Sequence, residues 1–236
     1  MRTIGILGGM SWESTLLYYR WLNEGVRQRL GGLHSARIVM HSVDFQPVEA
    51  AMQRGDWDNV QAQLTAAALS VRNAGADFLL IATNTMHKLA DAISRDAELP
   101  VLHIADATAA HVISRGHSTV GLLGTAFTME QPFYRDRLRD LFGLTVLTPS
   151  PEDRTLIHDV IFQELCNGVI LPESRAAYLR IVRDLAQRGA QAVIMGCTEI
   201  CLLLENADSP VPLLDTTRLH VEAALDNALA DHAEQN

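Results

Sequence analysis

Short apolar runs alternate with longer amphipathic stretches along most of the chain. The runs have the length of β-strands and lie at Thr3–Leu7, Arg37–Val43, Phe78–Ala82, Val101–Ile104, Thr119–Leu123, Leu144–Leu147, Ala192–Met195 and Val211–Leu214. Strands that alternate with helices pair in parallel, and the helices cover both faces of the sheet. The alternation therefore predicts an α/β fold with mostly parallel sheets.

The intervening stretches carry apolar residues at helical spacing. The clearest case is the segment 153–166, where one helical face carries Leu156, Ile157, Val160, Ile161 and Leu165. The predicted helices are Glu13–Leu30, Trp57–Asn73, Asn84–Arg95, Ala107–Arg115, Glu130–Phe142, Asp153–Cys166, Ser174–Arg188 and Thr217–Ala230.

One strand and the turn after it occur twice. Gly75–Thr85 aligns without a gap on Gly189–Glu199, and the alignment places Thr83 on Cys197. Each copy follows a helical segment, runs through an apolar strand and stops at a small polar cluster. This repeat predicts two similar halves, each of which offers one reactive side chain to a shared cleft.

A second similarity follows each copy. The segments 99–108 and 211–217 both contain a short strand and then Asp and Thr residues suited to capping a helix. We therefore expect two doubly wound domains, the first formed by residues 1–106 plus 209–236 and the second by residues 107–208. The last helix is expected to pack on the first domain.

Composition narrows the class of protein. The 236 residues are 48% hydrophobic, which suffices for one large or two small α/β domains. A net charge of −9 argues against a general nucleic-acid surface. No apolar run is long enough to span a bilayer, and Met1–Leu7 is expected to be a strand rather than a signal peptide. Three cysteines are too few for a disulfide framework, which favours a cytoplasmic location.

The sequence offers little support for a cofactor or a metal. Lys88 is the only lysine and lies in a predicted helix, so pyridoxal-phosphate chemistry is disfavoured. The turn Gly8–Ser14 lacks the dinucleotide and P-loop patterns. Its glycines would allow a small carboxylate to approach backbone N–H groups, or they serve only a tight turn. The nine histidines show no metal-ligand spacing.

Cys197 is the strongest candidate for a reactive side chain. It follows a strand and opens a helix, whose N-terminal partial positive charge favours a thiolate. The alternative is a small buried residue at a tight junction. The polar surroundings in Gly196–Glu199 favour the functional interpretation, whereas the neighbouring Cys201 is expected to be a packing residue.

Two further clusters occupy similar positions. Thr83–Thr85 either contributes to catalysis or caps a helix, and the two roles can coexist. His87 lies one helical turn from Thr83 and either faces the cleft or packs beside it. In Gly124–Thr128, two hydroxyls three residues apart at a helix start could bind an anion.

Four ordered motifs, Gly8–Met10, Thr83–His87, Gly121–Thr128 and Gly196–Glu199, resemble those of the aspartate/glutamate racemase superfamily over almost the whole chain. The resemblance implies two Rossmann-like domains with parallel sheets, related by pseudo-twofold symmetry around a cleft. It also implies a homodimer without cofactor or metal, and proton transfer at the α-carbon of an amino acid.

The sequence departs from most of this superfamily at Thr83, where a first cysteine is usual. The Thr/Cys pair is similar to the branch described as L-aspartate/glutamate-specific racemases. The resemblance implies that Cys197 deprotonates the L-substrate and Thr83 protonates the opposite face. Because an aliphatic hydroxyl is a weak acid, the return reaction is expected to be slow.

The resemblance also supplies candidate substrate contacts. These are Met10, Gln53, Asn84, Thr85, Thr125 and Thr198. Other branches place basic residues near Gln53 to clamp the substrate, and here Arg54 is available for that role or Gln53 supplies a hydrogen bond. Acidic substrates are therefore less firmly implied than the reaction type.

Three alternatives stay open. The chain could be a broad-specificity amino-acid racemase, or a decarboxylase or isomerase of the same fold that uses only Cys197. It could also be a non-catalytic amino-acid-binding module.

Overall fold

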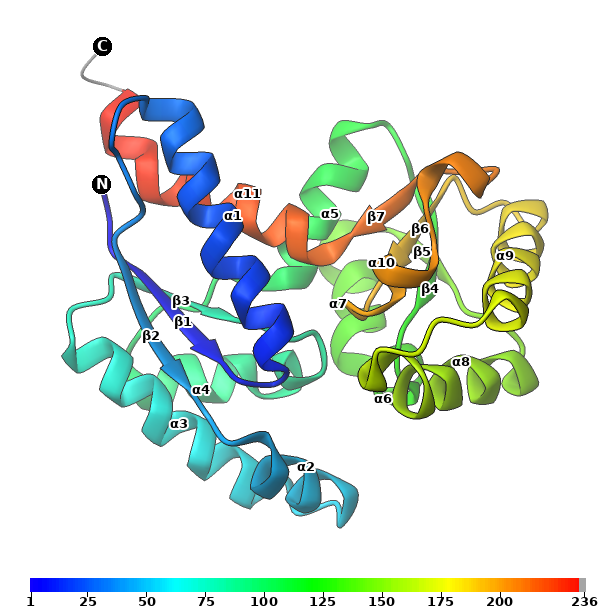
Figure 1. Ribbon diagram of the computed structural model, residues 1–236, viewed down its shortest axis with the longest axis horizontal. Coiled ribbons are helices and arrows are strands. Elements are labelled where there is room, and N and C mark those ends of the chain that lie inside the picture. The colour runs from blue at the N-terminus through cyan, green and yellow to red at the C-terminus, as the bar shows by residue number, and fades with distance from the viewer. Residues whose placement is uncertain (234–236) are drawn as a thin grey trace. The chain divides into compact units, whose positions relative to one another are not determined.

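The computed structural model describes residues 1–233, with side chains described as far as residue 230. The chain forms two compact units, one made of Met1–Ile104 and the chain from His220 onward, the other of Ala105–Leu219. Each contains a parallel sheet flanked by helices, so the predicted α/β class is confirmed (Figure 1).

The first unit has a three-stranded parallel sheet in the order β2-β1-β3. Its strands are β1 (Ile4–Gly8), β2 (Ile38–Ser42) and β3 (Phe78–Ile81). Its helices are α1 (Trp12–Leu30), α2 (Phe45–Gln53), α3 (Trp57–Asn73), η1 (Thr85–Leu89), α4 (Ala90–Ala97) and α11 (Thr216–Ala233), which begins in the second unit.

Strands β1 and β3 are buried along their whole length, and successive residues of β1 point to opposite faces of the sheet. Ile4 and Ile6 join a core with Tyr18 and Leu22 of α1 and with α11, and these two helices lie together on one face (Figure 1). On the other face, a Cβ on Gly5 would lie 2.6 Å from Val71 Cγ1 of α3. Glycine therefore lets α3 pack closely against the sheet.

The second unit has a four-stranded parallel sheet in the order β5-β4-β6-β7. Its strands are β4 (Thr119–Leu123), β5 (Thr145–Leu147), β6 (Ala192–Met195) and β7 (Leu213–Asp215). Its helices are α5 (Ile104–Ser114), α6 (Ala126–Glu130), α7 (Pro132–Phe142), α8 (Pro151–Gln163), η2 (Leu165–Asn167), α9 (Pro172–Gln187), α10 (Ile200–Leu203) and η3 (Asn206–Asp208).

The two sheets share one connectivity. The order β2-β1-β3 continues through a parallel bridge between Leu79 and Val101, which matches the order β5-β4-β6-β7. The pairing of Val193 with Leu213 in the second sheet corresponds to that bridge. The repeat seen in the sequence is thus a repeat of backbone structure.

The observed division of the chain differs from the expected one at residues 105–106, which belong to the second unit, and over the longer segment 209–219. These residues were expected in the first domain, but β7 pairs with β6 and belongs to the second sheet. The chain crosses back only at His220, inside α11. The expected packing of the last helix is nevertheless observed, because Val221, Ala224 and Leu225 join the first unit's core.

No helix within the described residues has both the length and the apolar character needed to cross a bilayer.

Candidate functional site

The two repeated junctions place Thr83 and Cys197 at equivalent positions. Thr83 lies two residues beyond the end of β3, and Cys197 lies two residues beyond the end of β6. In open parallel sheets, ligands bind beyond the carboxyl ends of the strands.

In the first junction, both main-chain polar groups of Thr83 are held. Its N–H donates to the Ile81 carbonyl at 2.8 Å, and its carbonyl lies 2.8 Å from His87 Nδ1. The Thr83 hydroxyl makes no hydrogen bond to the described residues of its own unit. The backbone is therefore fixed while the half-buried hydroxyl is left for other chemistry.

Asn84 and Thr85 are buried beside Thr83. Asn84 occupies the cap position of η1, but its side chain makes no capping hydrogen bond. The capping interpretation of this cluster is therefore wrong for the Asn84 side chain. Burial of two polar side chains at a strand end fits a role other than starting a helix.

The backbone of the Gly8-Gly9 turn packs closely against neighbouring residues of the same unit. Gly9 has a φ of 92°, and a Cβ there would lie 2.2 Å from the Val43 carbonyl oxygen. Its N–H donates to Thr15 Oγ1 at 2.8 Å, and that hydroxyl donates to the Ser11 carbonyl at 2.8 Å. The tight-turn interpretation accounts for Gly9, since its amide is already bonded within the protein.

Two candidates of the first unit remain, Met10 and Gln53. Met10 follows the strand next to the one that leads to Thr83, whereas Gln53 lies at the end of helix α2. Ala82 donates to the Leu7 carbonyl at 2.9 Å, so the segments carrying Met10 and Thr83 leave neighbouring strands. Met10 is buried. Gln53 is exposed at the end of α2, and its side chain makes no hydrogen bond to the described residues.

The second junction centres on a thiol and a carboxylate. Cys197 Sγ lies 2.9 Å from Glu199 Oε2, and Thr198 Oγ1 lies 2.8 Å from the same oxygen. Glu199 therefore accepts hydrogen bonds from both side chains. All three residues are half-buried.

This arrangement corrects the expectation of a resting thiolate. Removal from water raises the pKa of Cys197 well above its ordinary value, and the Glu199 carboxylate raises it further. The helix that was expected to favour the thiolate is only the short α10, and it begins three residues later, at Ile200. Cys197 therefore rests as a thiol whose proton points at a carboxylate.

Gly196 allows the close approach of β4 at this point. Its N–H donates to the Leu123 carbonyl at 2.7 Å, and an added Cβ would lie 2.9 Å from that oxygen. A larger residue would push the junction away from β4, so glycine positions Cys197.

Thr125 and Thr128 lie at the end of the neighbouring strand β4. Thr125 caps α6 by accepting from the Thr128 N–H at 3.4 Å, and their hydroxyls lie 3.3 Å apart. Ala126 N–H donates to His158 Nδ1 at 3.2 Å. The amides at this helix start are thus bonded within the protein, which gives no support to the anion interpretation.

The other cysteines differ from Cys197. Cys201 is half-buried, and removal from water together with the nearby Asp215 carboxylate raises its pKa. Cys166 is exposed. In the part of the chain that the structure describes, no group of three or more His, Cys, Asp or Glu residues could hold a metal ion.

The residues that sequence analysis missed are Glu199 as a partner of Cys197 and the buried surroundings of His87. His87 is 3% exposed and packs against His103 and His220. Of the two positions considered for His87, packing beside Thr83 is the one observed.

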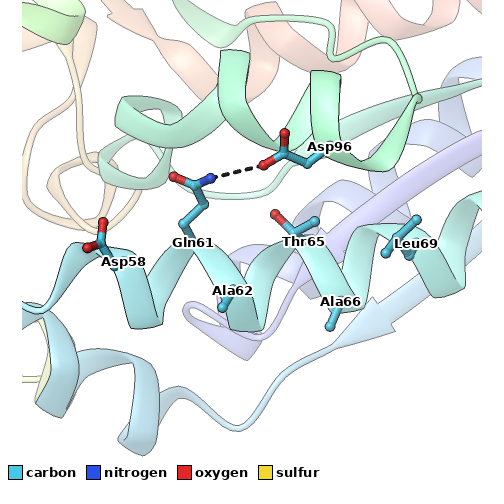
Figure 2. Close-up of a pocket in the computed structure, with 7 residues that line it drawn as sticks. All are labelled: Asp58, Gln61, Ala62, Thr65, Ala66, Leu69 and Asp96. Carbon is cyan, nitrogen blue, oxygen red and sulfur yellow. Dashed lines mark hydrogen bonds between the residues drawn. The ribbon is translucent and has the colours of Figure 1, made fainter.

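Two hollows lie in the surface of the first unit, and neither is lined by Thr83, Asn84 or Thr85. The one in Figure 2 lies between α3 and α4, has a volume of about 490 Å³, and includes a 3.0 Å hydrogen bond from Gln61 to Asp96. The other, about 290 Å³, is lined by Trp12, Thr15, Leu16, Tyr19, Met40 and Ser42.

Residues 7–224 match the family model described as Asp/Glu/Hydantoin racemase, and the chain belongs to that family. It is accordingly an enzyme of the racemase class, an isomerase.

Solved structures agree. A crystal structure from Yersinia pestis, of a protein with a provisional Asp/Glu racemase name, is 49% identical, covers 97% of this chain and 100% of that one, and has a TM-score of 0.93. An aspartate racemase homologue from Pyrococcus horikoshii is 31% identical over 97% of this chain and 99% of that one, with a TM-score of 0.84.

A curated relative is more distant. The broad-specificity amino-acid racemase RacX of Bacillus subtilis is 21% identical over 96% of this chain and 98% of its own length. The chain therefore covers 98–100% of the length of each of these three relatives.

Proposed function

We propose that the protein racemises L-aspartate or L-glutamate without a cofactor, with Cys197 as the base and Thr83 as the proton donor on the opposite face. The observation that supports this most is the 2.9 Å contact between Cys197 Sγ and Glu199 Oε2. It joins the thiol to a group that can accept its proton.

The proposed sequence of proton transfers begins at that contact. Glu199 takes the proton of Cys197, and the resulting thiolate removes the α-proton of the L-amino acid. The carbanion left at the α-carbon takes the hydroxyl proton of Thr83 on its other face. Water then reprotonates Thr83, and Glu199 returns its proton to the solvent.

The two faces differ in what each group can do. The Cys197 thiol can exchange its proton with solvent and return it to the same face. Thr83 donates to a strongly basic carbanion, and in the reverse direction it removes the α-proton only as its rarely formed alkoxide. Enantiomers have equal free energies in water, so kcat/KM must be equal in the two directions. The difference should appear instead in kcat and KM separately, and in exchange without inversion.

The test is a deuterium-exchange panel in deuterated water with L- and D-aspartate, L- and D-glutamate and the other amino acids. Recovered L-substrate should carry deuterium before D-product accumulates, whereas D-substrate should not exchange without inverting. Folded protein that exchanges no α-proton from any amino acid would refute the proposal. It would then favour the amino-acid-binding module, whose signature is stabilisation by ligand alone.

A broad-specificity racemase is the second candidate. The only cation among the predicted substrate contacts is Arg54, the alternative to Gln53, and both residues lie exposed at the end of α2. If neither side chain reaches the substrate, the site gives little preference for acidic side chains. Comparable exchange rates for neutral and acidic amino acids in the same panel would favour this candidate. Malonate and maleate, tested for CO₂ and fumarate, cover the remaining decarboxylase and isomerase alternatives.

We further propose that the enzyme acts in the cytoplasm. We also propose that it is a homodimer, which size-exclusion chromatography with light scattering would test.

A further inference from the structure

Three histidines lie buried together in the first unit. His87, His103 and His220 are 3%, 5% and 0% exposed. The ring centroids of His87 and His103 are 4.6 Å apart, and those of His87 and His220 are 5.7 Å apart. Burying three imidazoles is costly unless their nitrogens are satisfied, so their hydrogen bonds define what they do.

The partners of His87 fix its protonation. Nδ1 lies 2.8 Å from the Thr83 carbonyl oxygen, and Nε2 lies 3.2 Å from the Ile104 amide nitrogen. A carbonyl only accepts and an amide N–H only donates, so Nδ1 carries the proton and Nε2 is the acceptor. Burial, together with His103 and His220, lowers the pKa of His87 well below its ordinary value and keeps the ring neutral.

His220 has a different task in the same cluster. Its Nε2 lies 2.7 Å from the Leu102 carbonyl oxygen, and its Nδ1 lies 2.7 Å from the Tyr18 hydroxyl. By the same logic, Nε2–H donates to Leu102 and Tyr18 donates to Nδ1. Both ring nitrogens of His220 are thus engaged by Leu102 and Tyr18, so a change at Tyr18 is a control of similar burial that leaves the bond between His87 and the Thr83 carbonyl in place.

We propose that His87 is a positioning residue for Thr83. The Nδ1–H of His87 donates to the main-chain carbonyl of Thr83 and so fixes the backbone that carries the hydroxyl. The inference rests on the proposed role of Thr83 as proton donor. With the Thr83 N–H bonded to Ile81 and its carbonyl bonded to His87, only the side-chain torsion remains to aim the hydroxyl. That torsion is stiff in a β-branched residue.

The second junction supports a role specific to the hydroxyl. Cys201 occupies the position of His87 in the repeat, and the carbonyl of Cys197 accepts from the Ile200 N–H at 3.2 Å. No side chain of the described second unit is seen to hold that carbonyl; instead Glu199 holds the thiol itself. The side-chain hydrogen bond to the main-chain carbonyl therefore occurs at Thr83, whose hydroxyl has no hydrogen-bond partner within its unit, and not at Cys197, whose thiol is bonded to Glu199.

The experiment measures how many exchanged molecules invert. The enzyme acts on L-aspartate in deuterated water, and the ratio of D-product to α-deuterium incorporated is recorded for four forms: the parent, His87→Leu, His87→Asn and Tyr18→Phe. An asparagine amide can reach the place of Nδ1 and donate to Thr83, whereas leucine cannot. Misplacing a reacting group by about 1 Å can cost about 100-fold in rate.

We expect His87→Leu to lower the inverted fraction at least about tenfold while exchange at the L-face persists. His87→Asn should restore most of the inverted fraction, and Tyr18→Phe should leave it unchanged even if the protein is less stable. Exchange and inversion that fall in the same proportion in His87→Leu, or an unchanged ratio, would overturn the inference.

A second pair of variants keeps the test decisive if His87→Leu does not fold. His87→Gln places an acceptor toward the Ile104 amide but no donor at the Nδ1 position, so it should invert less than His87→Asn; the reverse ranking would contradict the inference. A parent enzyme that exchanges no α-proton would overturn the proposed function together with this inference. Parent exchange with a ratio insensitive to His87 would overturn the inference alone.

Discussion

The junctions after β3 and β6 share a backbone path and differ in the hydrogen bonds around their candidate reactive residues. Thr83 and Cys197 occupy the same position, Thr85 is replaced by Glu199, and His87 is replaced by Cys201. In the second junction a carboxylate accepts a hydrogen bond from the Cys197 thiol. In the first junction the His87 imidazole is hydrogen-bonded to the main-chain carbonyl of Thr83.

This difference follows from the acidities of the two groups. A thiol can become a base at neutral pH if a nearby group takes its proton, and Glu199 is placed to do so. An aliphatic hydroxyl does not ionise at rest, so a neighbouring acceptor would serve no purpose; accurate placement is what it needs. Under the proposed mechanism, the two copies of one structural unit serve one as a base and the other as a proton donor.

The largest effect should come from removing the thiol. Cys197→Ser replaces the group that forms the base with a hydroxyl, and α-proton exchange from L-aspartate should fall by about 1,000-fold. The measurement is loss of the α-proton signal by NMR in deuterated water. Cys166→Ser is the matched control, because Cys166 is exposed and is only a minor cause of the raised pKa of Cys197, so exchange should change little. Full exchange in Cys197→Ser would show that the base lies elsewhere.

A smaller loss should follow from Glu199→Gln. The amide cannot take the thiol proton, so exchange at neutral pH should fall by about 100-fold. At the same time the pKa of Cys197 should move down, because the carboxylate that raises it is gone. The pH dependence of thiol alkylation measures this shift. An unchanged alkylation profile would mean that burial alone sets the pKa of Cys197.

The contact between Cys197 and Glu199 also predicts how the free energy of unfolding depends on pH. A thiol whose pKa is raised by folding holds its proton more tightly in the folded state, so its contribution is fully present below the unfolded pKa. It is lost as the pH rises from about 8.5 toward the folded pKa. Cys197 and Cys201 both act in this direction. Urea unfolding at increasing pH should show a shallower decline for Glu199→Gln than for the parent.

Local patterns were enough to predict the repeated junction and seven of the eight expected strands. The expected strand Val101–Ile104 is wrong, because Val101 forms only an isolated bridge with Leu79 and Ile104 already begins α5. Apolar runs and their spacing identify β3 and β6, and the alignment of Thr83 with Cys197 survives as an equivalence of backbone positions. The assignment of residues 209–219 was wrong although the repeat contained the answer: Val101 extends the first sheet, so its counterpart in β7 extends the second.

Long-range and electrostatic features were beyond the sequence. Tyr18 and His220 are 202 positions apart, and no local pattern indicates that they meet beside His87. The expected thiolate failed for another reason. The sequence shows Glu199 two residues from Cys197, but not that its carboxylate turns back onto the sulfur. Helix dipoles are easier to infer from sequence than side-chain direction, and here the side chain decides.

A moderate effect is expected when the two junctions are given the same reactive group. Thr83→Cys supplies a thiol that can exchange its proton with solvent, so D-aspartate should begin to exchange without inverting. The asymmetry between the enantiomers should shrink by about tenfold. The measurement compares deuterium in recovered L- and D-substrate. A parent enzyme in which both enantiomers already exchange equally would contradict the division of roles.

The smallest effect concerns the frame that the junctions share. Gly75 and Gly189 precede the two strands at equivalent positions, with φ values of 94° and 102° and no atom within 4 Å of an added Cβ. Alanine at either position meets backbone strain without a clash, so Gly75→Ala and Gly189→Ala should each cost about 1–2 kcal/mol in the free energy of unfolding. Urea denaturation of the two variants measures this directly. Gly9→Ala provides the contrast, because its Cβ would collide with Val43 and the cost should be larger. Unequal costs at Gly75 and Gly189 would show that the two copies have diverged in their backbone as well as in their chemistry.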